Sequence, residues 1–343
     1  MRHLTRRNFL VLGGSFALGL AGRHLRVAAA LPDYEELLDP PTPLGRITTW
    51  RWQTLHSEPS FGSKVLGSRI YDDVVRLRAT VVGEAPWPSN PTWYLTDGGF
   101  IHSAFVQPVR DEPQTDVLRA ISPPGIWVQV CVPYTDAYWQ PGGERRARRL
   151  YYGTVYRAVA SELHSDQSRW YRLQEGIILG STLGPYVPAQ SVRQVQPEDL
   201  APLSPGLKDK WILISIGEQQ LVCLEDDVPV FQTRVASGVH DRATPLGEFR
   251  VFLKRHASRM TGDDYDLPGV AFPVYFTRSG VAIHGTYWHN DYGQRHSHGC
   301  VNVTNEAAQW IFRWAEPQVP YTSHNLQVSG DAGTRVVVVA TTA

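Results

Sequence analysis

The amino-acid sequence predicts a mainly β protein that is divided into several small domains. Short apolar runs rich in Trp, Tyr, Val and Thr follow one another, and Gly and Pro interrupt them often. Helical periodicity is clear only in residues 305–315, where Thr304 or Asn305 can cap the first turn and Pro317 ends the helix. With 343 residues, the chain can hold two or three domains with separate cores.

The first thirty residues are predicted to be an export signal. Residues 5–10 (Thr-Arg-Arg-Asn-Phe-Leu) resemble the twin-arginine signal, an apolar run follows them, and Ala28-Ala29-Ala30 offers small residues for cleavage. A membrane anchor is the alternative, but the apolar run is shorter than the roughly 20 residues that a spanning helix needs. We therefore expect an exported bacterial protein of the cell wall or periplasm.

The charge balance argues against nucleic acid as a partner. The chain has 33 basic and 33 acidic residues, and residues 1–30 contain five of the arginines and no acid, which leaves a formal charge of −5 after the signal. Binding to nucleic acid normally needs a basic surface. The basic cluster at residues 145–149 is expected to be a solvated loop leading into a strand, and contact with an anionic wall polymer is its alternative role.

The region between the signal and residue 196 carries a weak internal repeat. Residues 91–96 (PTWYLT) and 101–106 (IHSAFV) are similar to residues 168–173 (SRWYRL) and 186–192 (YVPAQSV). A Trp-Tyr strand, a turn and a closing strand resemble bacterial Src-homology-3-like modules, small β-barrels that bind peptidoglycan or act as spacers. The alternative is a single irregular β-domain whose strands are similar only because of β-propensity.

The catalytic half is expected to be a sheet of hairpins after a Pro-rich linker. Its expected strands are residues 211–216, 219–224, 228–236, 248–253 and 335–340, the last of which closes the sheet. The predicted domains are 1–30 (signal), 31–45 (Pro-rich lead-in), 46–118 and 119–196 (two modules), 197–206 (linker) and 207–343 (catalytic domain).

One short segment carries the chemistry. Cysteine is scarce, with three in the chain, yet Cys300 stands in Ser-His-Gly-Cys-Val-Asn, and a second histidine, His284, precedes it. The thiolate is the reactive form of cysteine, and a histidine within hydrogen-bond reach can generate it. Gly299 allows a tight turn that directs backbone N–H groups at a developing oxyanion. The pattern indicates cysteine acyl transfer.

Residues 283–312 resemble the catalytic motif of the L,D-transpeptidases, bacterial enzymes that cross-link peptidoglycan through a cysteine thioester. That family's pattern is His-Gly or His-Ser, a spacer, Ser/Thr-His-Gly-Cys, a hydrophobic residue, and Asn or Arg, and all of it is present here in order. The resemblance extends upstream through residues 237–238, 244–249 and 265–285. It implies a β-sandwich with one packed helix and no cofactor.

The resemblance also implies roles for individual residues. Cys300 is the expected nucleophile and His284 the expected base, with the backbone carbonyl of Gly285 holding the other ring nitrogen. The backbone N–H groups of His298, Gly299 and Cys300 are expected to form the oxyanion hole. The His298 side chain would shape the pocket.

Further residues are expected around this centre. Trp288 would wall the acyl-donor pocket, and Tyr265 belongs to an expected lid, with a surface-loop tyrosine as the alternative. Ser297 and Asn302 would hold the loop, although both residue types are also common turn formers. Ser237 and Gly238 would form the opposite rim, unless they are simply a hairpin turn.

A metal site is the alternative interpretation of the same histidines. Their spacing and that of the cysteine do not match a usual zinc motif, so no metal is expected. The five candidate ligands would be His284, His289, His296, His298 and Cys300, with His289 and His296 otherwise exposed in a loop. Cys131 and Cys223 lie in strand-like runs, where free cysteine is usually a small buried hydrophobe, but a disulfide between them is also possible.

The expected partners are peptidoglycan stem peptides. The thiolate would attack the bond between the third residue of a tetrapeptide stem and the terminal D-alanine, and an amine on a neighbouring stem would then take the acyl group to form a 3-3 cross-link. Water as acceptor would make a carboxypeptidase, and a protein amine would make a wall-anchoring transferase. A non-catalytic peptidoglycan-binding protein is the remaining alternative. The sequence gives no oligomeric state.

Overall fold

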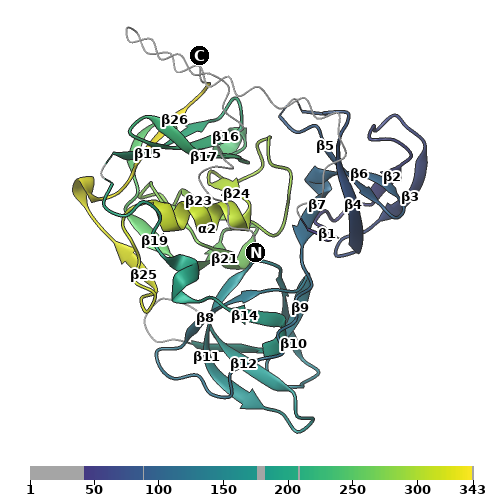
Figure 1. Ribbon diagram of the computed structural model, residues 1–343, viewed down its shortest axis with the longest axis vertical. Helices are drawn as coiled ribbons and strands as arrows, with labels where there is room; N and C mark the ends of the chain where they lie inside the picture. Colours follow the sequence, from purple (N-terminus) through teal and green to yellow (C-terminus); the bar gives the residue numbers. More distant parts are fainter. Residues whose placement is uncertain (1–41, 88, 176–181, 208, 342–343) are drawn as a thin grey trace.

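The computed structural model describes residues 42–341 apart from 88, 176–181 and 208. The expected signal and most of the Pro-rich lead-in therefore lie outside the described residues. Within the described chain, no helix has the length and apolarity needed to cross a membrane. Strands dominate, as the sequence predicts, and three groups of them are arranged side by side in Figure 1.

The first group, drawn in purple and blue in Figure 1, is a seven-stranded antiparallel sheet that we call module 1. Its strand order is β3-β2-β6-β5-β4-β1-β7. Alternating buried residues of β4 and Tyr94 of β5 face a small core of its own. The strands are β1 (Leu44–Ile47), β2 (Gln53–His56), β3 (Val65–Arg69), β4 (Val74–Val82), β5 (Thr92–Thr96), β6 (Gly99–His102) and β7 (Val106–Val109).

The second group, module 2, repeats this arrangement. Its order is β10-β9-β13-β12-β11-β8-β14, which is the order of module 1 with every strand number raised by seven. Trp93 on β5 and Trp170 on β12 occupy equivalent strands, and a 3-10 turn precedes the last strand in both modules. The strands are β8 (Ile126–Val130), β9 (Tyr134–Tyr138), β10 (Arg146–Tyr151), β11 (Val155–Leu163), β12 (Arg169–Glu175), β13 (Thr182–Pro188) and β14 (Val192–Gln194).

The two sheets lie within the ranges expected for two modules except that β1 begins at Leu44, inside the expected lead-in, and the repeated segments of the sequence occupy matching places in them. A single irregular β-domain does not describe this arrangement. The likeness to Src-homology-3-like barrels and the stated domain boundaries remain predictions. Residues 146–149 of the basic cluster lie in strand β10 and only residue 145 precedes it, so the cluster is mostly strand rather than loop.

The third group contains Cys300 and consists of two five-stranded sheets, a hairpin and one helix. The first sheet has the order β17-β16-β15-β26-β18 and the second β24-β23-β22-β19-β25. The first sheet comprises β15 (Lys210–Ser215), β16 (Gln220–Glu225), β17 (Val228–Arg234), β18 (Gly247–Arg250) and β26 (Arg335–Val339). The remaining strands are β19 (Leu253–Arg255), β20 (Ala257–Thr261), β21 (Asp266–Ala271), β22 (Val274–Tyr275), β23 (Ala282–Gly285), β24 (Val301–Val303) and β25 (Asn325–Gln327).

Helix α2 (Asn305–Trp314) packs between these sheets. The Thr304 side chain accepts a hydrogen bond from the backbone N–H of Ala307 (3.2 Å), which caps the first turn as the sequence predicts. The helix buries Ala308, Ile311 and Trp314 against both sheets because these residues recur at helical spacing. One expectation fails: β26 does not close the sheet at an edge but lies inside it, parallel to β15.

Candidate active site

Two short parallel strands bring the expected nucleophile and base together. Strands β23 and β24 pair in parallel, with His284 opposite Asn302 in the register. Cys300 immediately precedes β24, so its backbone lies at the end of the same pair. The chain between them, residues 286–299, forms a loop that leaves the sheet and returns to it.

His284 is fixed as a neutral imidazole. It is 2% exposed, and its Nδ1 lies 2.9 Å from the carbonyl oxygen of Gly285, the contact expected from the sequence. Burial lowers its pKa from 6.5 to about 4, the Gly285 carbonyl opposing this shift. If Nδ1–H donates to Gly285, Nε2 carries the lone pair, and it accepts from the Nδ2 of Asn302 (3.2 Å).

Cys300 is a partly exposed free thiol. Its Sγ contacts the carbonyl oxygen of Gly280 at 3.8 Å, and no hydrogen bond joins it to His284 in the described structure. Burial raises the pKa of the thiol to about 11, a backbone hydrogen bond at Ala282 opposing the shift. The imidazole of His284 and the thiol of Cys300 are therefore both neutral at pH 7.

The Ser-His-Gly-Cys segment is held in a tight turn. The Ser297 hydroxyl donates to the carbonyl of Cys300 (2.5 Å) and accepts from the N–H of Gly299 (3.1 Å). Gly299 has a φ of +117°, which a residue with a side chain adopts only with strain. The N–H of Gly299 is already hydrogen-bonded to the Ser297 hydroxyl. Of the three backbone N–H groups expected to bind the oxyanion, that of Gly299 is therefore engaged within the turn.

The Ser237-Gly238 segment supports this turn from below. The backbone N–H groups of His296 and Ser297 donate to the carbonyl of Ser237, and Thr244 links the N–H of Gly238 to the carbonyl of Gly299 (2.9 Å each). Ser237 is fully buried and its hydroxyl binds Gln219. The expected rim is thus a buried support, because a side chain enclosed in this way is not presented to a substrate.

The hairpin of β20 and β21 lies against His298. The tip of this hairpin places Asp264 3.2 Å from the Nε2 of His298, and the Tyr265 ring lies 5.1 Å from the imidazole. Burial, followed by nearby negative groups, raises the pKa of Tyr265. The His298 side chain is exposed, so its contacts with Asp264 and Tyr265 determine its position. The contact with Asp264 is not predicted from the sequence.

A polar chain that the sequence does not predict extends behind His284. Asn302 contacts His284 through Nδ2 and the buried His289 through Oδ1 (3.4 Å). Asp291 then lies 2.6 Å from the Nδ1 of His289 and 2.8 Å from that of His296. The expectation that His289 is an exposed loop residue is wrong, since it is 5% exposed and enclosed by this chain. Nearby His298 and Cys300 are not part of it.

The same chain bears on the metal alternative. Within the part of the chain that the structure describes, one group of side chains has metal-ligating spacing, namely His289, Asp291 and His296. It includes neither His284 nor Cys300, so the five-ligand set considered from the sequence is not assembled. The rings of His289 and His296 stack with centroids 4.0 Å apart. Each ring therefore presents its Nδ1 to one of the two carboxylate oxygens of Asp291.

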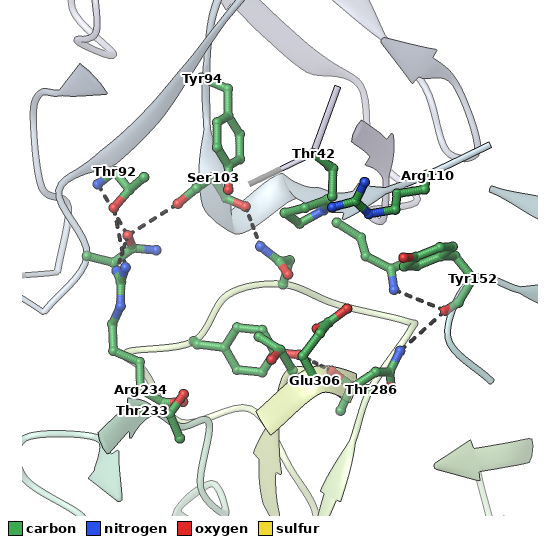
Figure 2. A pocket seen from close by; sticks show the side chains of 17 residues that line it. Thr42, Thr92, Tyr94, Ser103, Arg110, Tyr152, Thr233, Arg234, Thr286 and Glu306 are labelled. Atoms are coloured by element: carbon green, nitrogen blue, oxygen red, sulfur yellow. Dashed lines mark hydrogen bonds between the residues drawn. The ribbon is translucent and has the colours of Figure 1, made fainter. Parts of the chain in front are cut away.

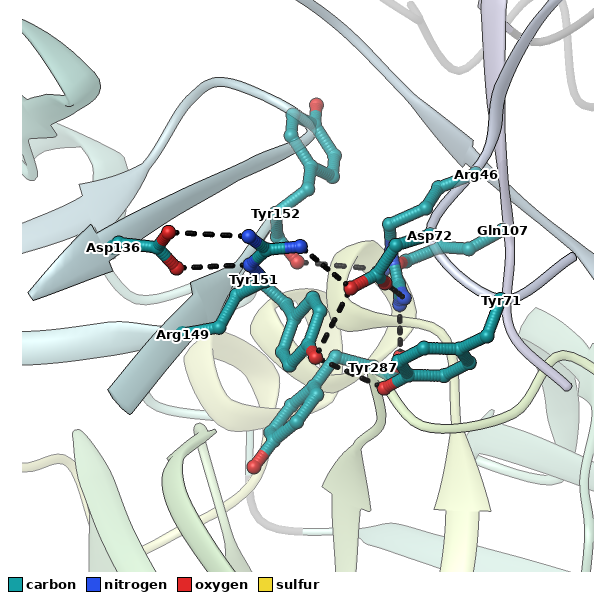
Figure 3. A network of polar contacts seen from close by, with 9 residues as sticks. All are labelled: Arg46, Tyr71, Asp72, Gln107, Asp136, Arg149, Tyr151, Tyr152 and Tyr287. Carbon is teal, nitrogen blue, oxygen red and sulfur yellow. Dashed lines mark hydrogen bonds and ion pairs between the residues drawn. The ribbon is translucent and has the colours of Figure 1, made fainter. Parts of the chain in front are cut away.

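Trp288 and Tyr287 connect the site to both modules. The Trp288 ring lies 5.9 Å from that of His284, and Tyr287 stacks on Tyr151 of module 2 at 5.2 Å. The buried Arg46 of module 1 donates to the carbonyl of Tyr287 and pairs with Asp72 at 2.8 Å (Figure 3). The loop that carries Trp288 is therefore held by residues from outside the catalytic half.

A cavity of about 500 Å³ lies behind this loop, between module 1 and α2 (Figure 2). Thr92 and Ser103 line it from module 1, whereas Thr286 and Glu306 line it from the catalytic half. Neither Cys300 nor His284 is among its lining residues. It is therefore separate from the reacting sulfur.

Cys131 and Cys223 are both buried and both free, so the possible disulfide is not formed. Desolvation raises the pKa of both thiols, to about 11 for Cys131. Cys131 and Cys223 are therefore unreactive buried hydrophobes, in contrast to the partly exposed Cys300.

Residues 209–338 match the YkuD family, the L,D-transpeptidase catalytic domain. This stretch contains His284, Cys300 and the loop between them, so the chain carries an L,D-transpeptidase catalytic domain over these residues. The match covers the third group of strands and neither of the two modules. No curated protein matches the chain.

Solved L,D-transpeptidases are also similar to this chain. The avibactam carbamoyl enzyme of Ldtfm is 25% identical over 38% of this chain and 49% of that one, with a TM-score of 0.31. The C442S mutant of the Enterococcus faecium enzyme is 24% identical over 39% and 50%, with a TM-score of 0.31. The enzyme of Xylanimonas cellulosilytica is 25% identical over 44% and 72%, with a TM-score of 0.30. This chain spans about half the length of the first two structures.

Proposed function

We propose that this chain is an exported cell-wall enzyme that forms 3-3 peptidoglycan cross-links through a thioester on Cys300. The observation that carries the proposal is the paired end of β23 and β24. There a partly exposed thiol precedes β24, and the neighbouring strand β23 carries a buried histidine whose Nδ1 is held by the Gly285 carbonyl, so that Nε2 is the nitrogen that can act as a base. A carboxylate is not needed to orient this imidazole, because the backbone carbonyl does so.

The proposed reaction has two halves. As the Cys300 sulfur bonds to the carbonyl carbon before the terminal D-alanine, its proton passes to Nε2 of His284. The oxyanion collapses, the C–N bond breaks, and His284 returns the proton to the leaving amine of D-alanine. An amine of a second stem then attacks the thioester and gives its proton to His284. The C–S bond breaks, and His284 returns that proton to the sulfur, which restores the thiol. Neutral thiol and neutral imidazole suit this concerted transfer.

Asn302 must release His284 for this reaction. Its Nδ2 occupies the lone pair of Nε2, the atom that receives the proton. The Oδ1 contact to His289 holds the Asn302 amide, and Asp291 holds His289 in turn. We infer that this chain of contacts fixes the distance between His284 and the incoming thiol.

The first test is intact-protein mass spectrometry with tetrapeptide-stem muropeptides. Wild type is expected to gain an adduct that lacks D-alanine and to produce cross-linked dimers. Cys300→Ala should do neither, and Cys131→Ala, which removes a buried thiol elsewhere, should behave as wild type. Tripeptide without dimers would support the carboxypeptidase alternative. Muropeptide retained without adduct or turnover would leave a non-catalytic wall-binding protein.

A further inference from the structure

A second cavity, of about 290 Å³, lies between module 2 and the catalytic half, at the root of the β20–β21 hairpin. Both parts of the chain contribute arginines to its wall, and among the residues that the structure describes there no aspartate or glutamate lines it. The lining residues that can donate hydrogen bonds through charged or hydroxyl groups are Arg148, Tyr156, Arg157, Arg255, Ser258, Arg259, Thr261 and His324.

Arg157, from β11 of module 2, is a buried charge without a carboxylate. It is 3% exposed, and its Nε and Nη2 donate to the carbonyls of Pro124 (2.8 Å) and Thr322 (3.2 Å). Its Nη1 has no hydrogen-bond partner. Burial lowers the pKa of this guanidinium, the ring of Tyr321 opposing the shift. Its guanidinium also lies over the ring of Trp127, 5.1 Å from the centroid. Carbonyl dipoles and a ring face compensate a buried charge less well than an anion does.

Arg255 approaches from the catalytic half, at the end of β19. Its Nε is also buried without a partner, and its Nη1 reaches Ser258 only at 3.5 Å. Its guanidinium lies over the ring of Tyr275, 5.6 Å from the centroid. Among the described residues no carboxylate pairs with Arg255 or with Arg157. Asp266 of β21 is already engaged by Arg259 in a bidentate pair.

We propose that this cavity binds a phosphate dianion, either free or as the terminal group of a monoester, between module 2 and the hairpin. Phosphate carries a charge of about −1.5 to −2 and several acceptor oxygens, so it compensates converging guanidinium groups better than a carboxylate does. Planar guanidinium groups also match its geometry in pairs. Arg157 and Arg255 are the two groups whose charge it would compensate from opposite walls.

The position gives this site a structural consequence. The β20–β21 hairpin carries Tyr265 and Asp264 at its tip, against His298, and Pro268 and Gly269 of β21 line the cavity. Tyr156 of module 2 already donates to the carbonyl of Pro268 (3.4 Å). A bound phosphate would tie module 2 to the root of the hairpin that contacts the catalytic loop. This site does not depend on the proposed transpeptidation.

The test measures binding with the full-length Cys300→Ala chain, so that it is separated from turnover. Titration calorimetry at constant ionic strength with inorganic phosphate is expected to show one saturable site. Acetate should bind at least tenfold more weakly. Glycerol 3-phosphate distinguishes the two sources, since a monoester site accepts it and a site for the free anion does not. Absence of saturable phosphate binding would overturn the proposal.

Two variants and a control locate the site. Arg255→Met and Arg157→Met should each weaken phosphate binding at least tenfold, whereas Arg119→Met, which removes an exposed arginine of module 2 that does not line the cavity, should not. Phosphate should raise the melting temperature of the parent chain and of Arg119→Met only. Should Arg157→Met fail to fold, Arg255→Met decides. Unchanged binding in the folded variants would show that the anion binds elsewhere and would refute the assignment.

Discussion

Modules 1 and 2 share one strand order but join the catalytic half in different ways. Module 2 contributes Trp127 and Val155 to the main hydrophobic core, next to residues of both catalytic sheets and α2. Module 1 keeps a separate core and reaches the catalytic half through polar contacts, among them Ser89 to Gly293 (2.5 Å) and Asn290 to Ser103 (2.9 Å). Figure 1 shows module 1 to one side of the other two groups.

The difference teaches that topology does not determine how strongly a domain depends on its neighbour. An apolar interface contributes to stability in proportion to the area it buries. In a polar interface, hydrogen bonds to water are replaced by hydrogen bonds within the protein, and the net gain is small. We therefore expect module 2 to unfold together with the catalytic half and module 1 to unfold by itself.

The largest effect is expected when the apolar join is cut. Trp127→Ala removes a side chain that is 2% exposed in the shared core and stacks on His256 at 4.7 Å, so it should cost about 3–5 kcal/mol and lower the stability of the catalytic half. Trp93→Ala, a fully buried tryptophan of module 1, is the matched control and should destabilise module 1 alone. Calorimetric unfolding separates the transitions, and one shared loss in both variants would contradict the comparison.

The next effect concerns the buried charge of module 1. Arg46→Met removes the 2.8 Å partner of Asp72, which keeps Arg149 at 3.0 Å, and it frees the carbonyl of Tyr287. It should therefore cost about 1.5–3 kcal/mol in module 1 and slow acylation of Cys300. Arg78→Met, which breaks an exposed pair with Asp97, should change neither. Denaturant unfolding and the rate of acyl-enzyme formation are the measurements. Unaltered acylation would mean that the Tyr287 contact does not hold the catalytic loop.

A smaller effect is expected from pH at the apolar join. Burial lowers the pKa of His256 from 6.5 to about 3, so the unfolded chain binds a proton that the folded chain refuses between those values. Stability is therefore lost as pH falls through this window, by about 2 kcal/mol between pH 7 and pH 5. His256→Phe should reduce the loss by that amount in urea unfolding. Burial also lowers the pKa of His284, so its contribution to the loss of stability has the same sign. An equal loss of stability in wild type and His256→Phe would show that a group other than His256 causes it.

The smallest effects are expected at the polar join. Asn290→Ala and Ser89→Ala each remove one side-chain hydrogen bond between module 1 and the catalytic loop, at a cost of about 1 kcal/mol. The double variant should lower the melting temperature of neither core by more than a few degrees, yet it should increase amide exchange in residues 286–293. Protection equal to that of wild type would show that module 1 does not order this loop.

The sequence predicts Cys300 and His284 as the reactive pair because they lie in one short stretch whose residue types are tied to the chemistry, and the structure places them on the paired strands β23 and β24, or next to them, while their roles stay predictions. The Gly285 carbonyl contact follows from the same stretch. The chain of Asn302, His289 and Asp291 does not, because the burial of a polar loop residue depends on how the loop returns to the sheet.

Contacts between distant parts of the chain are equally hidden in the sequence. The parallel pairing that puts β26 beside β15 needs a long connection, and no local pattern specifies its place in the order. Arg157 and Arg255 each look like ordinary surface arginines in the sequence. Only the packing of module 2 on the catalytic half brings them to one cavity.

The two hydrogen bonds that join module 1 to residues 286–293 also determine how the protein responds to a pulling force. The hydrogen bonds of Ser89 and Asn290 are lost once their donor and acceptor separate by a small distance. The apolar contacts between module 2 and the main core are lost one after another as the two parts separate. A pulling force on module 1 would therefore break first at the loop that carries Trp288. Such a force would reach residues 286–293 before it disturbed the core of module 1 or the main core.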